Sequence, residues 1–164
     1  MPDVTRRSVA AFGAAAAFVM TRPVVAQSGD PEAQTMLGRV RGTRSGGINV
    51  FKGIRYGADT RPVRFQAPRL ATPWTETVAA TAFGGACPQR GNEGRGSEAQ
   101  SEDCLFLNVW TPGLRDGAKR PVLFYIHGGA YSTGSGAYPL YDGANLAAKG
   151  DVVVVTVNHR INLF

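Results

Sequence analysis

Val122-Leu123-Phe124-Tyr125-Ile126-His127-Gly128-Gly129-Ala130 is the stretch that decides the fold of this 164-residue chain. The continuous apolar run at 122–126 predicts a β-strand buried on both faces, because a half-exposed strand would alternate polar and apolar residues. The two glycines after His127 predict a tight turn that leaves backbone N–H groups uncovered at the end of the strand. Such a loop presents hydrogen-bond donors to an oxygen atom that carries negative charge.

A second buried strand is predicted at Val152–Val157, which contains four consecutive valines. Between the two runs, Asp142–Lys149 predicts a short helix, with Asp142 as its N-cap and Gly150 as its stop. Strand, helix and strand form a βαβ unit. The sequence therefore predicts an α/β fold whose sheet is parallel here.

The first half of the chain predicts a β-hairpin at Met36–Tyr56, with its turn at Ser45-Gly46-Gly47. Residues 27–35 are polar and are expected to be loose. Asp59–Trp74 holds three prolines and predicts an irregular surface segment. Four residues after the turn are expected to share one face of the hairpin: Ile48, Val50, Ile54 and Tyr56. Further strand and loop predictions are a strand at Leu105–Trp110 and an exposed loop at Gln89–Gln100.

The composition predicts about one globular domain, with 43% hydrophobic and 18% charged residues. The net charge of +6 is partly local, because three of the 18 basic and one of the 12 acidic residues lie within positions 1–26, which leaves +4 for the rest. The remaining charges are scattered without a Lys/Arg block, which argues against nucleic-acid binding. No cofactor is expected.

Positions 1–26 predict an export signal of the twin-arginine type, with 27–164 as the mature domain. Arg6 and Arg7 precede an Ala-rich apolar stretch that is too short to span a bilayer, and Val24-Val25-Ala26 ends in small residues suited to cleavage. The alternatives are an ordinary secretory signal or a simple membrane anchor. We expect a protein of the bacterial periplasm or the medium, with no membrane span after cleavage.

Two cysteines, Cys87 and Cys104, are present. An even count in an exported protein favours a disulfide. The alternative is two separate buried thiols. A metal site is not expected, because no histidine stands at ligand spacing from either cysteine.

Four stretches resemble, in order, motifs of the type-B carboxylesterase family, which includes cholinesterases and para-nitrobenzyl esterases. The most specific is the sequence Glu-Asp-Cys-Leu-Phe-Leu-Asn-Val at 102–109, which matches E-D-C-L-x-L-N-[VI]. The others are F-x-G-I-x-Y at 51–56, R-F-x-x-P with a following P-W at 64–68 and 73–74, and the loop at 127 together with Asn158-His159-Arg160. Arg55 stands where the family often has Pro, which is expected to loosen its loop, and His159 stands where it often has Tyr.

The resemblance implies an α/β-hydrolase fold, of which this chain is the N-terminal part: a β-hairpin followed by the first strands of a central, mostly parallel sheet. It implies that Cys87 and Cys104 form the family's first disulfide loop. It also suggests an ion pair between Arg64 and Glu102; the alternative is two solvated charges of little effect.

The resemblance further implies that the glycine loop is an oxyanion hole. Gly129 and Ala130 would donate their N–H groups, and Gly128 would supply the backbone freedom for the turn. His127 and His159 are expected to pack or orient rather than to carry protons. Three side chains are candidates to line the acyl or alcohol side of a pocket, or else are simply exposed: Tyr131, Ser132 and Tyr138.

The implied activity is that of a serine carboxylesterase acting on small-molecule esters through an acyl-enzyme. The family's G-x-S-x-G elbow is absent from these 164 residues, as are the acid and base expected after it. We therefore expect the chain to be a fragment that is inactive alone and leaves an apolar strand edge open. The alternative is a non-catalytic, cholinesterase-like binding module.

Overall fold

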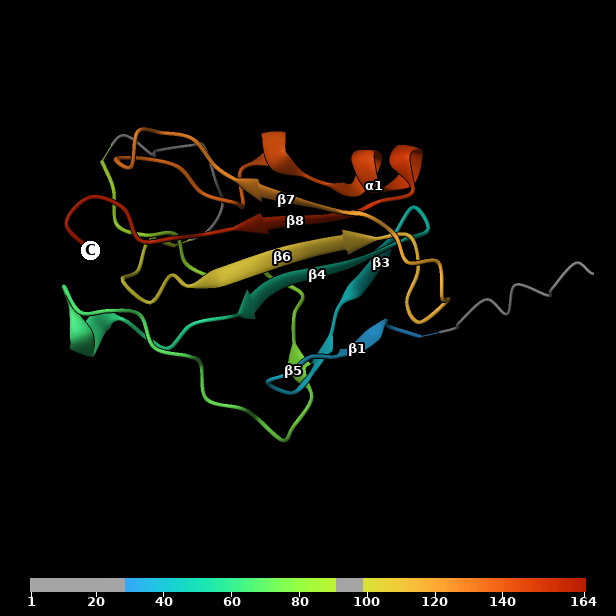
Figure 1. Ribbon diagram of the computed structural model, residues 1–164, viewed down its shortest axis with the longest axis horizontal. Helices are drawn as coiled ribbons and strands as arrows, with labels where there is room; N and C mark the ends of the chain where they lie inside the picture. The colour runs from blue at the N-terminus through green and yellow to red at the C-terminus, as the bar shows by residue number, and fades with distance from the viewer. Residues whose placement is uncertain (1–28, 91–98) are drawn as a thin grey trace, which may run out of the picture.

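The computed structural model describes residues 29–90 and 99–164 (Figure 1). The predicted signal at 1–26 and most of the predicted loop at 89–100 lie outside the described residues. The strands are β1 (Glu32–Gln34), β2 (Arg39–Arg41), β3 (Thr43–Ser45), β4 (Ile48–Arg55), β5 (Val78–Ala79), β6 (Phe106–Thr111), β7 (Val122–Ile126) and β8 (Val153–Val157). The helices are the 3₁₀ turns η1 (Arg61–Val63) and η2 (Pro139–Tyr141) and the α-helix α1 (Ala144–Gly150).

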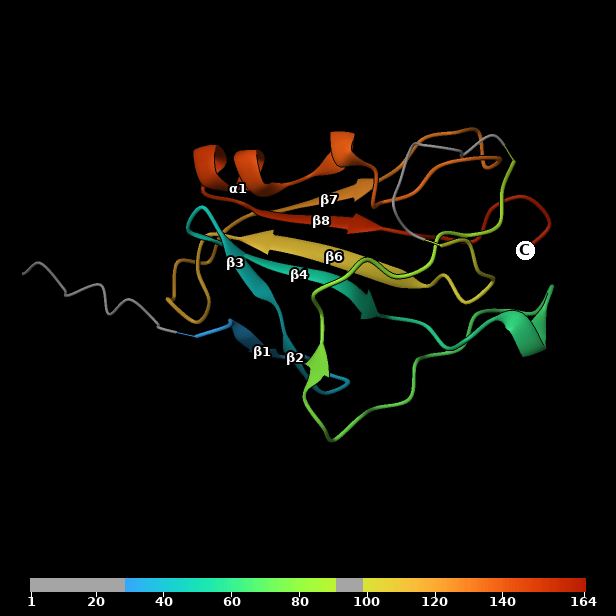
Figure 2. The same cartoon turned by 180° about the vertical axis from the view of Figure 1, so that it is seen from behind.

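The main sheet has five strands in the order β3-β4-β6-β8-β7 (Figures 1 and 2). The expected parallel pairing is present between β7 and β8, which α1 connects as a βαβ unit. The other three pairings in this sheet are antiparallel, so the described part of the sheet is mixed, which fits the expected hairpin followed by the first strands of a larger sheet. A two-residue hairpin turn joins β3 to β4 and makes these two neighbours antiparallel.

A second, small sheet has the order β1-β2-β5. The expectation that 27–35 is loose is wrong for its second half. Strand β1 lies there, and Ala33 pairs with Val40 of β2 in antiparallel register. Glu32–Gln34 holds no β-branched residue, so no local signal marked it as a strand. Val40 is fully buried and packs with Phe51 of β4, which fastens the small sheet to the main one.

The hairpin turn between β3 and β4 is where the sequence predicts it. Gly46 and Gly47 have φ of 55° and 83°, the left-handed conformation that a two-residue hairpin loop demands. The prediction that Ile54 shares a face with Ile48 and Val50 is wrong. The register of β4 against β6 shifts between Phe51 and Ile54, so Ile54 joins the cluster of Phe51, whereas Ile48 and Val50 pack with Trp110.

Strand β7 has the predicted bounds but not the predicted burial. It is the edge of the five-stranded sheet in the described residues, and Val122, Phe124 and Ile126 are each more than half exposed. The interior strand of this pair is β8, which lies between β6 and β7 in the sheet, and its Val154 and Val157 are buried. The open apolar edge expected from the sequence is therefore β7.

Helix α1 covers one face of the sheet beside β8 (Figure 2). The N-cap of α1 is Gly143 and not Asp142 as predicted, but the Asp142 carboxylate accepts the Ala144 N–H at 2.9 Å and so satisfies one free donor at the start of the helix. Gly150 is the last helical residue rather than the stop, and the helix ends at Asp151, which is left-handed with φ of 47°. No helix of the described residues is long and apolar enough to cross a bilayer.

The buried amide of Asn158 fastens three segments at the end of β8. Its Oδ1 accepts the N–H of Gly136 at 2.7 Å and the hydroxyl of Ser135 at 3.2 Å. Its Nδ2 donates to the carbonyl of Gly85 at 2.9 Å. The side chain is almost fully buried, and among the described residues the Gly136 N–H and the Gly85 carbonyl have no other hydrogen-bond partner.

Arg55 does not loosen its loop, contrary to the expectation from the missing proline. Its guanidinium donates to both carboxylate oxygens of Asp103, at 2.6 and 2.7 Å, and lies 4.5 Å from the ring centre of Phe106. The hydrogen bonds that Arg55 donates to Asp103 raise the pKa of Arg55, and both side chains are partly buried. This forked ion pair holds the end of β4 against the segment before β6.

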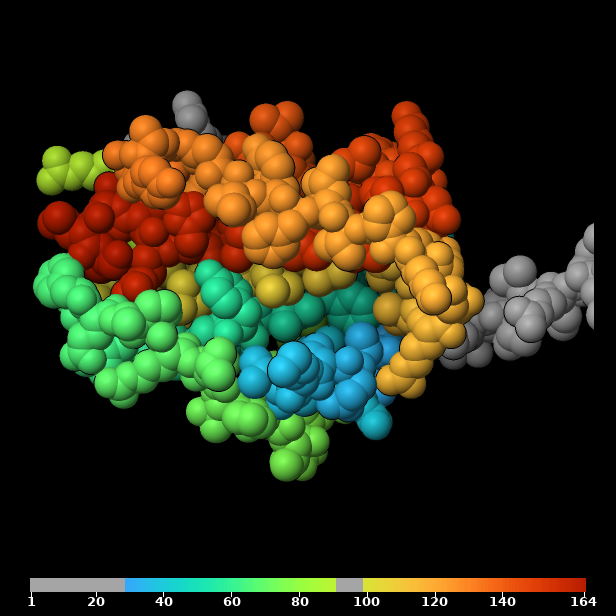
Figure 3. All heavy atoms as spheres, viewed as in Figure 1, coloured from blue at the N-terminus to red at the C-terminus, as the bar shows by residue number. Residues whose placement is uncertain are grey.

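The C-terminal residues lie against the segment around η1, as the contact of red and green atoms in Figure 3 shows. A guanidinium N–H of Arg160 donates to the Gln66 carbonyl at 2.8 Å. Nearby, Arg64 forms a forked ion pair with Glu102, with Nε donating to Oε2 at 2.6 Å. The pKa of Glu102 is held below its usual range by Arg64. The arginine is exposed, so solvent screens the pair.

We expect Arg55→Ala to lower the free energy of unfolding of the full-length protein by about 1–3 kcal/mol, because it leaves the sheltered Asp103 carboxylate unpaired. Urea denaturation measures the change. Arg61→Ala is the control, since Arg61 pairs with Asp59 in an exposed position. Equal shifts of the two midpoints would contradict the role given to Arg55.

Asn158→Ala should destabilise the protein by about 2–4 kcal/mol, because it strands a buried N–H and a buried carbonyl. Asn145→Ala, which removes the same side chain from the exposed face of α1, should leave the unfolding midpoint nearly unchanged. A midpoint for Asn158→Ala that matches the control would show that the amide does not fasten the three segments.

Candidate functional site

The loop of residues 127–134 follows β7 at the carboxyl end of the parallel strand pair (Figure 1). Its backbone is tightly wound: Gly129, Ala130 and Tyr131 have φ of 125°, 52° and 56°. The carbonyl of Gly129 accepts the N–H groups of Ser132 and Thr133 at 2.9 and 3.1 Å. Two successive non-glycine residues with positive φ mark a strained backbone of the kind that collects at functional sites.

The glycine requirement of this loop lies at Gly129, and not at Gly128 as the resemblance implied. A Cβ on Gly129 would lie 1.9 Å from the Thr133 carbonyl oxygen, and the positive φ adds strain. A Cβ on Gly128 would meet nothing within 4 Å, and its φ is not left-handed. Gly134 is required as well, since its Cβ would lie 2.2 Å from Nδ1 of His127.

Four successive N–H groups of the loop are available to a ligand. Within residues 29–90 and 99–164, the N–H groups of Gly128, Gly129, Ala130 and Tyr131 have no hydrogen-bond acceptor. All four residues line a cavity of about 230 Å³ together with Ile126 and His159, and the family resemblance selects Gly129 and Ala130 among them as donors. The site thus offers adjacent donors to an acceptor from outside the protein, as expected for an oxyanion-binding loop.

His127 and His159 stack face to face, with ring centroids 4.4 Å apart and an interplanar angle of 11°. Nδ1 of His127 lies 2.9 Å from the Gly128 carbonyl, so this nitrogen carries the proton in the neutral ring. Burial lowers the pKa of His127, and the neighbouring His159 lowers it further. The ring is therefore neutral near pH 7 and committed to the backbone, in keeping with the expected orienting role.

Two amide side chains fix the loop from outside, and the sequence analysis missed both. Gln89 accepts the Gly134 N–H at 2.6 Å and donates to the Gly134 carbonyl at 2.8 Å. The Asn162 N–H donates to the Tyr131 carbonyl at 2.7 Å, and its side chain donates to the Ser132 carbonyl at 3.0 Å. Nothing in a local pattern marks these long-range contacts.

The three candidate pocket side chains have different places. Tyr131 is largely exposed and lines the cavity beside Gly129. Ser132 lines a separate hollow with Asn162. Tyr138 is half-buried, and its ring lies 5.9 Å from that of Tyr141.

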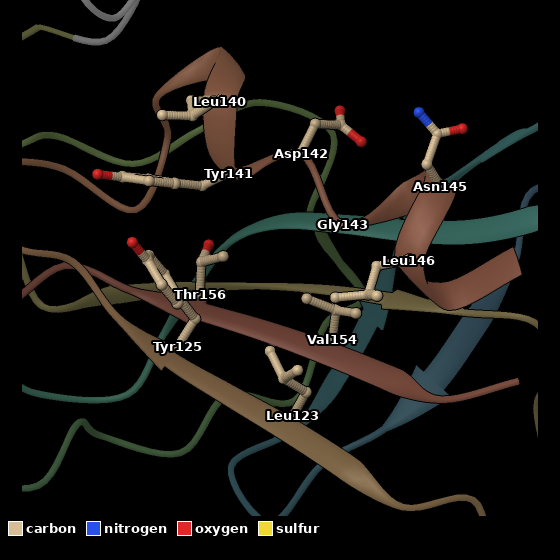
Figure 4. Close-up of a pocket in the computed structure, with 10 residues that line it drawn as sticks. All are labelled: Leu123, Tyr125, Leu140, Tyr141, Asp142, Gly143, Asn145, Leu146, Val154 and Thr156. Atoms are coloured by element: carbon tan, nitrogen blue, oxygen red, sulfur yellow. The ribbon is translucent and has the colours of Figure 1, made fainter. Parts of the chain in front are cut away.

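Two larger hollows flank the open edge strand. One, of about 450 Å³, lies between β7 and α1 (Figure 4), where Leu123 and Val154 form the floor and Tyr125 faces Tyr141 with ring centroids 4.7 Å apart. The other, of about 480 Å³, lies on the opposite face at Phe124 and Ile126. Neither is lined by the Gly129 or Ala130 donors, so both are apolar surface along β7 rather than the anion site.

The two cysteines are unbonded thiols, buried together in one cluster with Leu105 and Ile161. The neighbouring Cys104 thiol lowers the pKa of Cys87 to about 7, whereas the pKa of Cys104 is raised by Cys87 and also by burial. No group of three or more His, Cys, Asp or Glu side chains that could hold a metal ion occurs in the described part of the chain.

Comparison with known proteins agrees with this geometry. Residues 29–164 match the sequence model of the carboxylesterase family. The chain is 43% identical over 137 residues to the para-nitrobenzyl esterase of Bacillus subtilis, covering 79% of this chain and 27% of that protein. It is 42% identical over 161 residues to human carboxylesterase 3, covering 87% of this chain and 27% of that protein.

Among solved structures, the carboxylesterase of Geobacillus stearothermophilus is similar with a TM-score of 0.74 and 46% identity, covering 81% of this chain and 27% of that one. A structure described as a PNB esterase has the same score at 41% identity, with the same coverage. The chain thus spans about a quarter of the length of these relatives, and its fold is the N-terminal part of the α/β-hydrolase fold. The chain belongs to the carboxylesterase family.

Proposed function

We propose that this chain provides the oxyanion-binding part of a carboxylic ester hydrolase. The observation that carries the proposal is the run of N–H groups without an acceptor at 128–131, which includes those of Gly129 and Ala130 and lies beside a small cavity in a strained loop. Hydrolysis of an ester passes through a tetrahedral intermediate whose oxygen carries a negative charge. Donors that are already in place stabilise this oxygen without a cost of reorganisation.

The remaining catalytic groups come, in this proposal, from outside the 164 residues, which contain no G-x-S-x-G sequence. A serine would attack the carbonyl carbon with a histidine as base, and water would then hydrolyse the acyl-enzyme. The Gly129 and Ala130 N–H groups would bind the carbonyl oxygen from the moment of attack onward.

The proposed substrates are small-molecule esters, in line with the names of the relatives. Tyr131 and Ile126 line both the donor cavity and the apolar hollow beside it. An apolar acyl or alcohol group could therefore extend from the donors onto this surface.

We expect Gly129→Ala to lower kcat of the full-length protein on a nitrophenyl ester by about 10²–10³-fold, because the added Cβ displaces one donor. Gly128→Ala should cause a much smaller loss, since its Cβ meets open space. Similar losses in both variants would argue against the assignment of the donors. A full-length protein that binds esters but does not hydrolyse them would instead favour the binding module.

We also propose that the protein is exported through its twin-arginine signal, and that Cys87 and Cys104 then form a disulfide. Their burial in one cluster supports the pairing, and an exported protein meets an oxidising environment. In the chain-entropy view, a bond between them would stabilise the fold by about 3 kcal/mol.

One experiment tests both points. In the wild-type protein, thiol alkylation and mass spectrometry of the periplasmic fraction should find neither cysteine modified unless a reductant is added. The double variant Arg6→Lys/Arg7→Lys should remain in the cytoplasm with both thiols reduced. Alkylated cysteines in the exported wild type would refute the disulfide, and export of the double variant would refute the twin-arginine route.

A further inference from the structure

We propose that Gln89 is a positioning residue: its side-chain amide sets, through two peptide units of the loop, the direction in which the Ala130 N–H points. This inference rests on the proposed function, in which the Ala130 N–H is one of the two donors to the oxyanion. Gln89 does not line the cavity beside the donors, so it acts on them through the loop.

The side chain of Gln89 binds both polar groups of the Gly134 backbone. Its Oε1 accepts the Gly134 N–H at 2.6 Å, and its Nε2 donates to the Gly134 carbonyl at 2.8 Å. Two bonds from one planar amide fix the orientation of this residue, whereas a single bond would let it turn. Gly134 is buried, so its polar groups cannot exchange Gln89 for bulk water.

The first link to the donor is the peptide unit between Thr133 and Gly134. The Thr133 carbonyl and the Gly134 N–H belong to this planar unit and point in opposite directions. With the N–H directed at Gln89, the Thr133 carbonyl lies against Gly129, where its oxygen would be 1.9 Å from an added Cβ. Thr133 also donates its own N–H to the Gly129 carbonyl at 3.1 Å. Both backbone polar groups of Thr133 therefore contact Gly129.

The second link is the peptide unit between Gly129 and Ala130. The Gly129 carbonyl accepts the N–H groups of Ser132 and Thr133 at 2.9 and 3.1 Å. The Ala130 N–H belongs to the same planar unit and points the opposite way. Holding the carbonyl toward residues 132–133 therefore aims the Ala130 N–H away from them, and Ala130 lines the cavity of about 230 Å³.

Gln89 can hold the loop because its own segment is held by other parts of the fold. Its backbone N–H donates to Oε1 of Gln100 at 2.8 Å, and its Nε2 also donates to the Cys87 carbonyl at 3.1 Å. Cys87 is buried in one cluster with Leu105 and Ile161. The amide thus connects the donor loop to a segment that the core keeps in place.

The contacts of this amide require glutamine in particular. Nε2 has two hydrogens, and it donates to two carbonyl oxygens, those of Cys87 and Gly134. A glutamate of the same length could still accept the Gly134 N–H, but its second oxygen would face both carbonyls without a proton. A methionine of about the same length has no donor and only a weak acceptor. Both substitutions should therefore release Gly134.

The first test is turnover of a nitrophenyl ester by the full-length protein. Gln89→Glu and Gln89→Met should lower kcat per folded molecule by about 10–10²-fold and change KM by less than about threefold, because a misdirected donor weakens binding of the transition state. Gln66→Glu and Gln66→Met are the matched controls and should retain both constants, since the Gln66 side chain is exposed and bonds Arg69 at the surface.

A wild-type kcat in both Gln89 variants would overturn the proposal, as would a lower unfolding midpoint with kcat unchanged or a loss confined to KM. The Met variant introduces no charge and decides the matter even if the Glu variant does not fold.

The second test is backbone hydrogen exchange of the loop at single-residue resolution. The reporting amides are those of Ser132 and Thr133, which donate to the Gly129 carbonyl and not to Gln89. Their protection should fall by about tenfold or more in the Gln89 variants and stay unchanged in the Gln66 variants. Faster exchange confined to Gly134, whose N–H Gln89 binds directly, would overturn the link to the donor.

The two tests separate this proposal from the proposed function, because exchange does not depend on turnover. A wild-type protein that hydrolyses no ester but shows the predicted exchange would refute the esterase function and leave the link through Gln89 standing. A protein that hydrolyses esters, but whose Ser132 and Thr133 amides do not respond to the Gln89 substitutions, would refute the link and leave the esterase function standing.

Discussion

Parallel pairing of β7 with β8 is the constraint on which the site depends. Because Ile126 pairs with Val157, the two strands end together, and the residues that follow them must meet at one edge of the sheet. His127 therefore stacks on His159, and Asn158 reaches the backbone of the same loop. Ligand sites of open α/β sheets form at the carboxyl ends of strands for the same reason. The donor loop is thus a consequence of strand register as much as of its glycines.

The features predicted correctly from the sequence are those with a local cause. The apolar run at 122–126 has the bounds of β7, the glycine pair at 46–47 forms the hairpin turn, and the crossover from β7 through α1 to β8 is present. Each of these depends on a periodicity or a backbone preference that a short window contains.

The predictions that were wrong depend on the neighbours of an element. Strand β1 exists only because β2 lies beside it, and the exposure of β7 follows from its place in the strand order. The shift in register after Phe51 has no counterpart in an alternating pattern. Within the site, the glycine loop was located from its sequence, but the amides of Gln89 and Asn162 that fix it reach it across long stretches of chain.

The carboxylesterase family membership and the loop geometry support the same chemistry from independent directions. Similarity establishes the family and the fold, while the unsatisfied N–H groups give a physical reason for the loop to exist. A backbone with positive φ at Ala130 and Tyr131 has a conformational cost, which the bonds from Gln89, Asn162 and the strand ends offset.

The ion pair of Arg55 with Asp103 has a consequence for how this protein is stiffened. A proline at position 55 would restrict the denatured chain as well as the native one, and its stabilising effect would be largely entropic. The Arg55 pair leaves the denatured chain unrestricted and acts only after β4 and the segment before β6 have met. Position 55 therefore carries a restraint that exists only in the folded state, and because the pair is partly buried, salt screens it less than it screens an exposed pair.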